Sequence, residues 1–250
     1  MPPSESKSYE QNLEMEPIFA QALNSIPSND GNSTEKGAPV IWINGYPGTG
    51  KLTVATAVLS LLGTDRALLV DNHQLIDQVK ISRRNPRYWD ARKAERQLVF
   101  EKYVLSKSQK DKIIMFTDFQ TDTNNGADTS IEYLQAAQQA HRPFLPVSLT
   151  CQKDENIRRA TNPARCVTES GRVLNKLTDG SSLRRLRRLD LFDFDDLAHY
   201  EDAKLDGFII DITDTSADMA ARKIVEQLGA TFPELAVLSL ETHKTSPIDN

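Results

Sequence analysis

The run Gly45–Lys51 constrains the fold more than any other part of the sequence. It reads GYPGTGK and matches the pattern G-x-x-x-x-G-K. The apolar residues 40–43 (VIWI) precede it, and a helical pattern from Leu52 to Leu62 follows. A glycine-rich loop between a strand and a helix is typical of a phosphate-binding loop. Its backbone N–H groups point inward, and the N-terminus of the helix adds partial positive charge.

The loop therefore forms the first predicted site, with Lys51 reaching the outer phosphates as a point charge. The residue after this lysine is usually Ser or Thr, whose hydroxyl binds Mg²⁺, but here Leu52 follows and Thr53 comes next. One position turns a helical side chain by about 100°. Either the loop is locally adjusted so that Thr53 is a metal ligand, or water and carboxylates hold the magnesium. The predicted nucleotide-binding residues here are Gly45, Tyr46, Pro47, Gly48, Thr49, Gly50, Lys51, Leu52 and Thr53.

Apolar runs alternate with helical patterns along most of the chain. Such alternation is typical of an α/β fold, and strands that are apolar throughout indicate a sheet covered on both faces. We therefore predict a three-layer fold with a five-stranded parallel sheet. Asp128 or Thr129 is expected to cap the helix at 128–140, and Gly229 is expected to end the last helix. Strands are predicted at 40–43, 67–70, 112–116, 144–149 and 207–212, and helices at 52–62, 88–106, 128–140, 154–160 and 216–228.

The two ends of the chain differ from this central part. Residues 1–38 are rich in Ser, Asn, Pro, Glu and Lys, so we predict a flexible N-terminal tail there, a folded domain at 39–230 and a C-terminal tail at 231–250. No apolar run reaches the roughly 18 residues of a membrane span. The N-terminus lacks a secretory pattern, and two cysteines make no disulfide framework, so a cytoplasmic protein is expected. A net charge of −5 argues against a general binder of polyanions.

Acidic residues follow two of the predicted strands. Asp118 lies just after the strand at 112–116, and Asp71 follows the strand at 67–70. In parallel sheets, ligands gather at the carboxyl ends of strands. Asp118 is therefore the predicted magnesium ligand. Asp71 is the predicted catalytic base that accepts a proton from a substrate hydroxyl, and His73, two residues later, is a weaker catalytic candidate because a lone histidine is more often structural.

Arginines are concentrated between about 158 and 190, where the alternation of strands and helices is least clear. This stretch is predicted to be an inserted lid, because arginines on a closing lid can stabilise the charge that spreads over a transferred phosphoryl group. Arg158 is the predicted catalytic member, and Arg159 and Arg165 are predicted to bind the nucleotide, with Arg172 as an alternative to Arg165. A second cluster at 184–188 is best explained as a plain amphipathic helix, with a lid and, less favoured, a nucleic-acid patch as the alternatives.

These residues resemble those of the P-loop kinases of the adenylate-kinase-like group. The chain is most similar to small, uncharacterised proteins known as AAA-family ATPases or ATP-binding proteins. The shared runs are INGYPGTGKLT at 43–53, DNH at 71–73 and FTD at 116–118, and similar runs occur at 146–159 and 176–179. The resemblance spans about 39–230 and implies a five-stranded parallel sheet, ATP and Mg²⁺ as cofactors, a mobile arginine lid and a catalytic carboxylate at Asp71. Despite the AAA-family label of these proteins, the resemblance does not imply a ring-forming motor.

The sequence thus predicts an ATP-dependent phosphotransferase that acts on a small hydroxylated metabolite. Two alternatives stay open. The basic clusters suit a kinase of nucleotides or nucleic-acid ends, although nucleic acid is the less favoured partner. Leu52, which replaces the usual magnesium-binding hydroxyl, suits a non-catalytic ATP-binding regulator or an ATPase.

Overall fold

A computed structural model describes residues 36–166, 176–192, 195, 205 and 207–233. The predicted tails lie almost entirely outside these residues, as do Arg172 and the rest of 167–175 in the predicted lid. The chain divides into Met1–Glu35 and Lys36–Asn250, and the second unit holds all described residues. None of the described helices is both long and apolar enough to cross a membrane.

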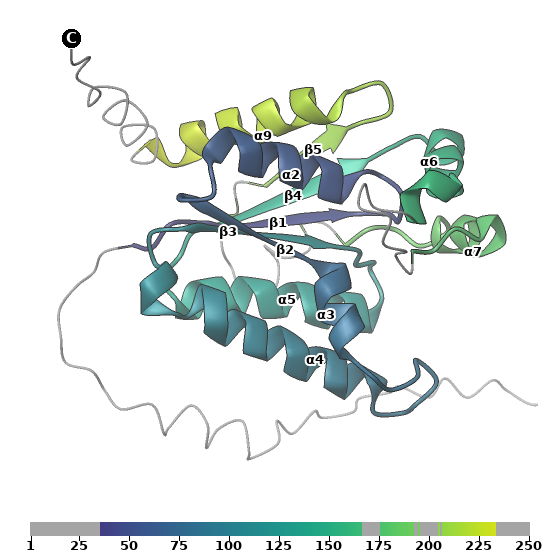
Figure 1. Cartoon of the computed structure of the whole chain (residues 1–250), viewed down its shortest axis with the longest axis horizontal. Coiled ribbons are helices and arrows are strands. Elements are labelled where there is room, and N and C mark those ends of the chain that lie inside the picture. The colour runs from purple at the N-terminus through teal and green to yellow at the C-terminus, as the bar shows by residue number, and fades with distance from the viewer. Residues whose placement is uncertain (1–35, 167–175, 193–194, 196–204, 206, 234–250) are drawn as a thin grey trace, which may run out of the picture. The chain divides into compact units, whose positions relative to one another are not determined.

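The centre of this unit is a five-stranded sheet with the order β2-β3-β1-β4-β5, in which every pair of neighbours is parallel (Figure 1). This confirms the predicted α/β fold and parallel sheet. Each strand begins within one residue of its predicted start, and most run one or two residues further. The strands are β1 (Val40–Gly45), β2 (Ala67–Asp71), β3 (Ile113–Asp118), β4 (Phe144–Thr150) and β5 (Phe208–Asp211).

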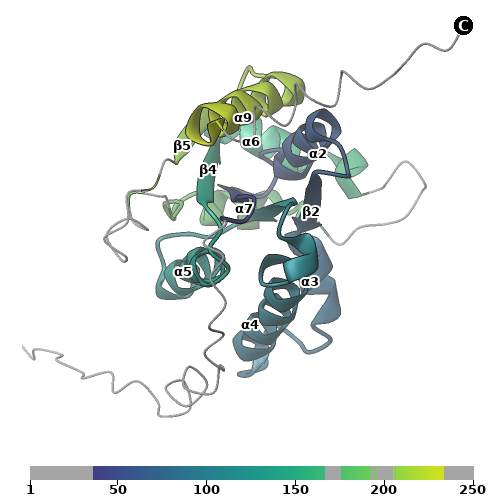
Figure 2. The same ribbon diagram turned by 90° about the vertical axis from the view of Figure 1, so that its left-hand side faces the viewer.

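Helices cover both faces of the sheet, so the fold has three layers (Figures 1 and 2). Helices α2 (Lys51–Leu62) and α9 (Ala217–Thr231) pack against each other on one face. The other face carries α3 (Asn72–Gln78), α4 (Tyr88–Val99) and α5 (Asn124–Gln139). Helices α6 (Lys153–Ala160) and α7 (Gly180–Leu186) lie beyond the carboxyl ends of the strands, on the right of Figure 1.

Successive residues of β1 supply the two hydrophobic cores in turn, because side chains along a strand point to alternate faces. Ile41 and Ile43 are buried under α2 and α9, whereas Val40 and Trp42 are buried on the side of α4 and α5. All six residues of β1 are buried. This burial on both faces explains why the strands read as continuous apolar runs.

Some helix boundaries differ from the predicted ones. Helix α5 begins at Asn124 with Thr123 as its N-cap, four residues before the predicted Asp128. Gly229 does not end α9, which continues to Thr231, where Phe232 packs against the core and its N–H bonds the carbonyl of Leu228. The predicted helix at 88–106 ends its α-helical part at Val99 and continues as a π-helix at Phe100–Val104.

Short helices complete the chain. Helix α3 follows β2 directly and was not predicted. The 3₁₀ turns are Lys107–Gln109 and Pro163–Cys166.

Candidate functional site: the phosphate loop and the carboxyl edge of the sheet

The loop between β1 and α2 turns sharply at two glycines. Gly48 has φ = 88° and Gly50 has φ = 93°, values that an L side chain rarely adopts. Gly50 is also the residue before α2, which begins at Lys51. The loop therefore ends at the N-terminus of a helix. The first N–H groups of a helix have no intrahelical partner, and they favour a bound anion. This is the geometry that the sequence motif requires.

Helix α6 supports the loop from outside. A Cβ atom on Gly48 would lie 2.4 Å from Cβ of Ala160, so the loop and the helix approach as closely as their backbones allow. The buried side chain of Asn156 donates through Nδ2 to the carbonyl of Pro47 at 3.0 Å. Thr49 closes the turn from within, because its Oγ1 donates to the carbonyl of Tyr46 at 2.9 Å. The shape of the loop is thus fixed by packing.

Lys51 points back into the loop. Its Nζ donates to the carbonyls of Gly45 at 2.6 Å and Tyr46 at 2.9 Å. Burial lowers the pKa of Lys51 to about 8, although the charges of Asp118 and Asp71 act in the opposite direction. A lysine that is buried among these groups gains most from a polyanionic ligand that replaces the lost solvation.

Asp118 lies at the end of β3, beside the end of β1, and is buried. Its Oδ1 accepts hydrogen bonds from Nδ2 of Asn72 at 2.5 Å and from the N–H of Phe119 at 2.7 Å. Its Oδ2 accepts a bond from Nε2 of Gln120 at 2.8 Å. The carboxylate is therefore held in one orientation at the edge of the sheet next to Lys51.

Asp71 ends β2, where it is in register with Thr117 of β3. Thr117 donates through Oγ1 to Oδ1 of Asp71 at 2.5 Å, and Nδ1 of His73 lies 3.1 Å from Oδ2. Burial acts to raise the pKa of Asp71, but hydrogen bonds from His73 and Thr117 outweigh it and lower the pKa. The structure thus brings Asp71, Asp118 and Lys51 together at one edge of the sheet, as the strand-end pattern predicts.

The three described arginines that were predicted as site residues, Arg158, Arg159 and Arg165, have different surroundings. Arg158 is 72% exposed and pairs with Glu155, whereas Arg159 donates to Glu155 and to the carbonyls of Ile212 and Thr213. Hydrogen bonds from Arg158 and then Arg159 lower the pKa of Glu155 to about 2. Arg159 therefore ties α6 to the segment after β5, while Arg158 faces solvent.

Arg165 follows α6 and donates to the carbonyls of Ala160 at 2.6 Å and Leu177 at 3.1 Å. It is close enough to Lys51 for its charge to lower the pKa of that lysine slightly. Arg165 is thus one arginine of the predicted lid whose charge acts on the phosphate loop. Its role in nucleotide binding stays a prediction.

Arg187, just after α7, contacts the phosphate loop. Its guanidinium lies 4.0 Å from the centre of the Tyr46 ring, and its Nη2 donates to the carbonyl of Cys151 at 3.0 Å. The Tyr46 hydroxyl donates to the carbonyl of Leu189 at 2.5 Å. The sequence singled out the cluster at 184–188, but nothing in the run LRRLRRL distinguishes the arginine that packs on Tyr46 from its neighbours.

Two further arginines, on helix α4 near Asn72 and Asp118, were not predicted. Arg92 and Arg96 are each 4% exposed, and Arg96 pairs with Glu132 at 2.8 Å. Arg92 donates to Oδ1 of Asn72 at 2.6 Å, and Asn72 in turn donates to Asp118. Their spacing could have been noticed, since Tyr88, Arg92 and Arg96 recur every fourth residue on the buried face of α4.

The side chains near the loop suit magnesium only in part. Among the described residues, no group of three or more His, Cys, Asp or Glu side chains could hold a metal ion. Mg²⁺ commonly needs only one or two carboxylates besides phosphates and water. Asp118 is such a carboxylate, but its oxygens already accept three hydrogen bonds, which favours contact through water. Thr53 is exposed on α2.

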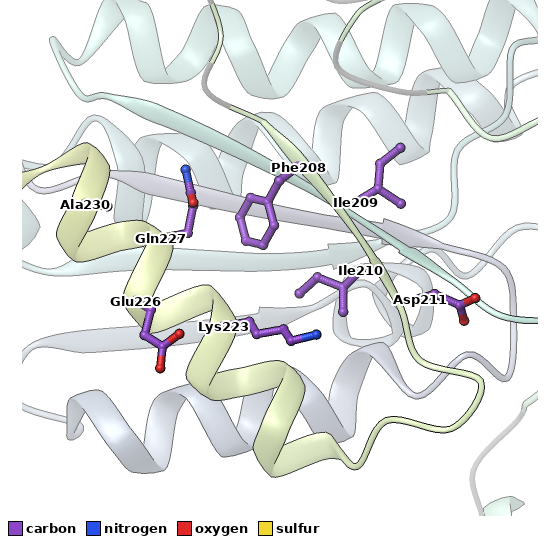
Figure 3. Close-up of a pocket in the computed structure, with 8 residues that line it drawn as sticks. All are labelled: Phe208, Ile209, Ile210, Asp211, Lys223, Glu226, Gln227 and Ala230. Carbon is purple, nitrogen blue, oxygen red and sulfur yellow. The ribbon is translucent and has the colours of Figure 1, made fainter.

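Two cavities lie elsewhere in the described chain. One, of about 460 Å³, lies between β5 and α9 and is lined by residues that include Phe208, Ile210 and Lys223 (Figure 3). The other, of about 380 Å³, lies between α4 and α5 beside Trp89. No residue of the phosphate loop lines either of them. The candidate site is thus defined by the loop and the strand ends.

The sheet, its order and the glycine-rich loop after β1 define a three-layer P-loop fold. Among solved structures, a protein from Chloroflexus aurantiacus that bears a provisional kinase name matches with a TM-score of 0.52 and 14% identity, over 78% of this chain and 98% of that chain. At this identity the likeness shows a shared fold and leaves the activity open. No family model matches the chain, and no curated protein sequence does.

Weaker likenesses point to structures of other kinases. A gluconokinase from Sinorhizobium meliloti matches with a TM-score of 0.49 and 13% identity, over 82% of this chain and 99% of that chain. The APS kinase of Mycobacterium tuberculosis, in complex with AMPPNP and APS, matches with a TM-score of 0.49 and 14% identity, over 78% and 99%. With TM-scores below 0.5, these two matches show nothing about the activity of this chain.

Proposed function

We propose that the chain is an ATP-dependent phosphotransferase that acts on a small hydroxylated metabolite. One observation carries this proposal: Asp118 and Asp71 end neighbouring strands of the sheet, close enough to Lys51 of the phosphate loop for their charges to act on it. A protein that only binds a nucleotide needs the loop alone. A kinase also needs acidic groups that hold the metal ion and accept the proton of the substrate hydroxyl. A cytoplasmic location, where ATP is abundant, agrees with this proposal.

The roles of the residues follow from their positions. The loop and Lys51 bind the phosphates, and Asp118 meets Mg²⁺ through water, with Thr53 as the alternative ligand. When bound, the metal neutralises charge that develops on the phosphates. Arg158 is proposed to move from Glu155 to the transferred group, since an exposed ion pair contributes little and is readily exchanged. Asp71 belongs to the acid–base part of the site.

The test is label transfer from γ-labelled ATP, with magnesium, into a fractionated extract of small metabolites. We expect a labelled small product with the wild-type protein and none with Lys51→Ala. Lys223→Ala is the matched control, because Lys223 lines the cavity beside α9 and not the loop (Figure 3). Free labelled phosphate without a product would instead indicate an ATPase. No movement of label, with ATP bound, would indicate a regulator.

A second candidate function rests on the exposed arginines of α7 and its C-terminal end. Arg184, Arg185 and Arg188 are exposed, and a row of such side chains suits a polyphosphate backbone. A kinase of nucleotides or nucleic-acid ends would use this surface for its acceptor. Its binding to a 5′-hydroxyl oligonucleotide should weaken steeply as salt is added. Absence of binding at low salt would exclude this candidate.

A further inference from the structure

We propose that Nε2 of His73 takes the proton of the acceptor hydroxyl, and that Asp71 orients the imidazole instead of accepting the proton itself. This inference rests on the proposed kinase function and names the group that activates the acceptor. It changes the assignment that the sequence favours, in which Asp71 is the base. Two observations support it, the contacts of the Asp71 carboxylate and the exposure of the two side chains, together with the imidazole tautomer that the first of them implies.

Both oxygens of Asp71 are engaged within the protein. Oδ1 accepts a hydrogen bond from the hydroxyl of Thr117 at 2.5 Å, and Oδ2 lies 3.1 Å from Nδ1 of His73. These bonds lower the pKa of Asp71 even though burial acts to raise it. A carboxylate stabilised in this way is a weak proton acceptor, whereas general-base catalysis works best with a group that is readily protonated near neutral pH.

The contact with Asp71 also fixes which nitrogen of His73 carries the proton. An ionised carboxylate can only accept hydrogen bonds, so Nδ1 must be the donor. In the neutral imidazole, the lone pair is then on Nε2, on the side of the ring away from Asp71. The pair thus has the arrangement of a carboxylate that holds a histidine base in one tautomer.

Exposure separates the two side chains further. The side chain of His73 is 41% exposed, whereas that of Asp71 is 13% exposed. A hydroxylated molecule that arrives from solvent therefore meets His73 before it meets Asp71. His73 is also within the first turn of α3, directly after β2, at the strand edge where Asp71 interacts electrostatically with Lys51.

The resulting step balances. The acceptor O–H gives its proton to Nε2 of His73, and the acceptor oxygen forms a bond to the γ-phosphorus of ATP. The bond between this phosphorus and the oxygen that bridges it to the β-phosphate breaks, and ADP leaves with that electron pair. The imidazolium, paired with Asp71, then releases its proton to solvent.

Two substitutions at the same position separate a base from a structural partner. Asparagine places an N–H donor close to the position of Nδ1, so His73→Asn retains a hydrogen bond to Asp71 but lacks Nε2. His73→Gln reaches the position of Nε2 without providing a base. We expect each variant to bind ATP as the wild type does and to lose about 100-fold or more in label transfer from γ-labelled ATP, which is the usual contribution of a general base. His141→Asn, at an exposed histidine with φ = 52°, is the control.

A second measurement needs no acceptor. Long-range ¹H–¹⁵N spectra of the full-length ¹⁵N-labelled protein report which imidazole nitrogens carry protons, and the signals of His73 are identified by their loss in His73→Asn. We expect Nδ1 protonated and Nε2 bare in the wild type. Asp71→Asn should move the proton toward Nε2, because an amide N–H can donate to Nδ1. An unchanged equilibrium in Asp71→Asn would show that Asp71 does not orient the imidazole and would contradict this part of the inference.

The outcomes distinguish this inference from the function on which it rests. If the wild type transfers label and His73→Asn stays within about threefold of it, Asp71 or water is the base and the inference is wrong. A proton on Nε2 in the wild type overturns it as well. If the wild type transfers label to no metabolite, the proposed function fails and takes this inference with it. Transfer that is lost in both His73 variants, with Nε2 bare, supports it.

Discussion

Replacement of Gly48 by alanine tests how tightly helix α6 supports the phosphate loop. Gly48 has φ = 88°, and its added Cβ would lie 2.4 Å from Cβ and 2.8 Å from Cα of Ala160. Gly50 offers a matched control in the same loop. It has a similar φ of 93°, but the atom nearest to its added Cβ is Cδ1 of Ile212 at 4.0 Å. The two substitutions therefore share backbone strain and differ in the clash.

The expected costs follow from this difference. Alanine with a left-handed backbone costs about 1–2 kcal/mol, which is the whole expected loss for Gly50→Ala. Overpacking adds about 1–3 kcal/mol at Gly48, so Gly48→Ala should lose about 2–5 kcal/mol of the free energy of unfolding in total. Because α6 must retreat to make room, Gly48→Ala should also displace the loop that Asn156 holds.

Urea unfolding of the three proteins measures these losses, and a double-mutant cycle with Ala160→Gly identifies their source. Ala160→Gly removes the nearer of the two clashing atoms, so the double variant should be more stable than the sum of the single losses predicts, by about 0.5–3 kcal/mol. Rescue stays incomplete because Cα of Ala160 is still 2.8 Å away. Equal losses for Gly48→Ala and Gly50→Ala, or an additive cycle, would refute the reasoning.

Three further predictions concern the same part of the molecule. Because the pKa of Lys51 is lowered to about 8, the lysine loses its proton as the pH rises through that value. The affinity for a fluorescent ATP analogue should therefore fall above about pH 8, whereas Lys51→Met should bind the analogue weakly at every pH. Asn156→Ala should cost about 1–3 kcal/mol in urea unfolding and weaken nucleotide binding, because the carbonyl of Pro47 loses its partner; unchanged binding would show that the loop holds its shape alone. Arg96→Met should cost about 3–5 kcal/mol by leaving Glu132 without its main partner, and Arg96→Met with Glu132→Leu should recover much of this loss; a double variant no more stable than the single one would contradict this.

Most of the sheet could be predicted from the sequence because its central strands β1, β3 and β4 are buried on both faces. Each strand is then a short apolar run bounded by polar residues, and its polar end marks the edge where ligands gather. Asp71 and Asp118 were located by this rule, and the structure places both beside Lys51. The phosphate loop was predictable for a similar reason, since its backbone shape demands glycine at particular positions.

The remaining differences arise where a residue's partner lies far along the chain. Arg159 was predicted to bind a nucleotide, which stays a prediction, but its hydrogen bond to the carbonyl of Ile212, 53 residues later, was not foreseen. The packing of Arg187 on Tyr46 likewise joins segments that no local pattern connects. Helix α3 was missed because it follows β2 without a loop and has only seven residues, with Leu75 as its buried residue. Such features depend on the tertiary structure and leave no periodic signal.

The anchoring of Arg159 also determines where a moving lid can pivot. Because this side chain fastens α6 to the carbonyls of Ile212 and Thr213, and Ala160 lies against Gly48, the helix belongs to the stationary body of the molecule. We therefore expect a hinge of the predicted lid to begin at or after residue 161. A segment that closes over the nucleotide would thus be shorter than the predicted lid of 158–190. Arg158 would lie outside it, on helix α6. Paired spin labels that report closure therefore need one position beyond this helix.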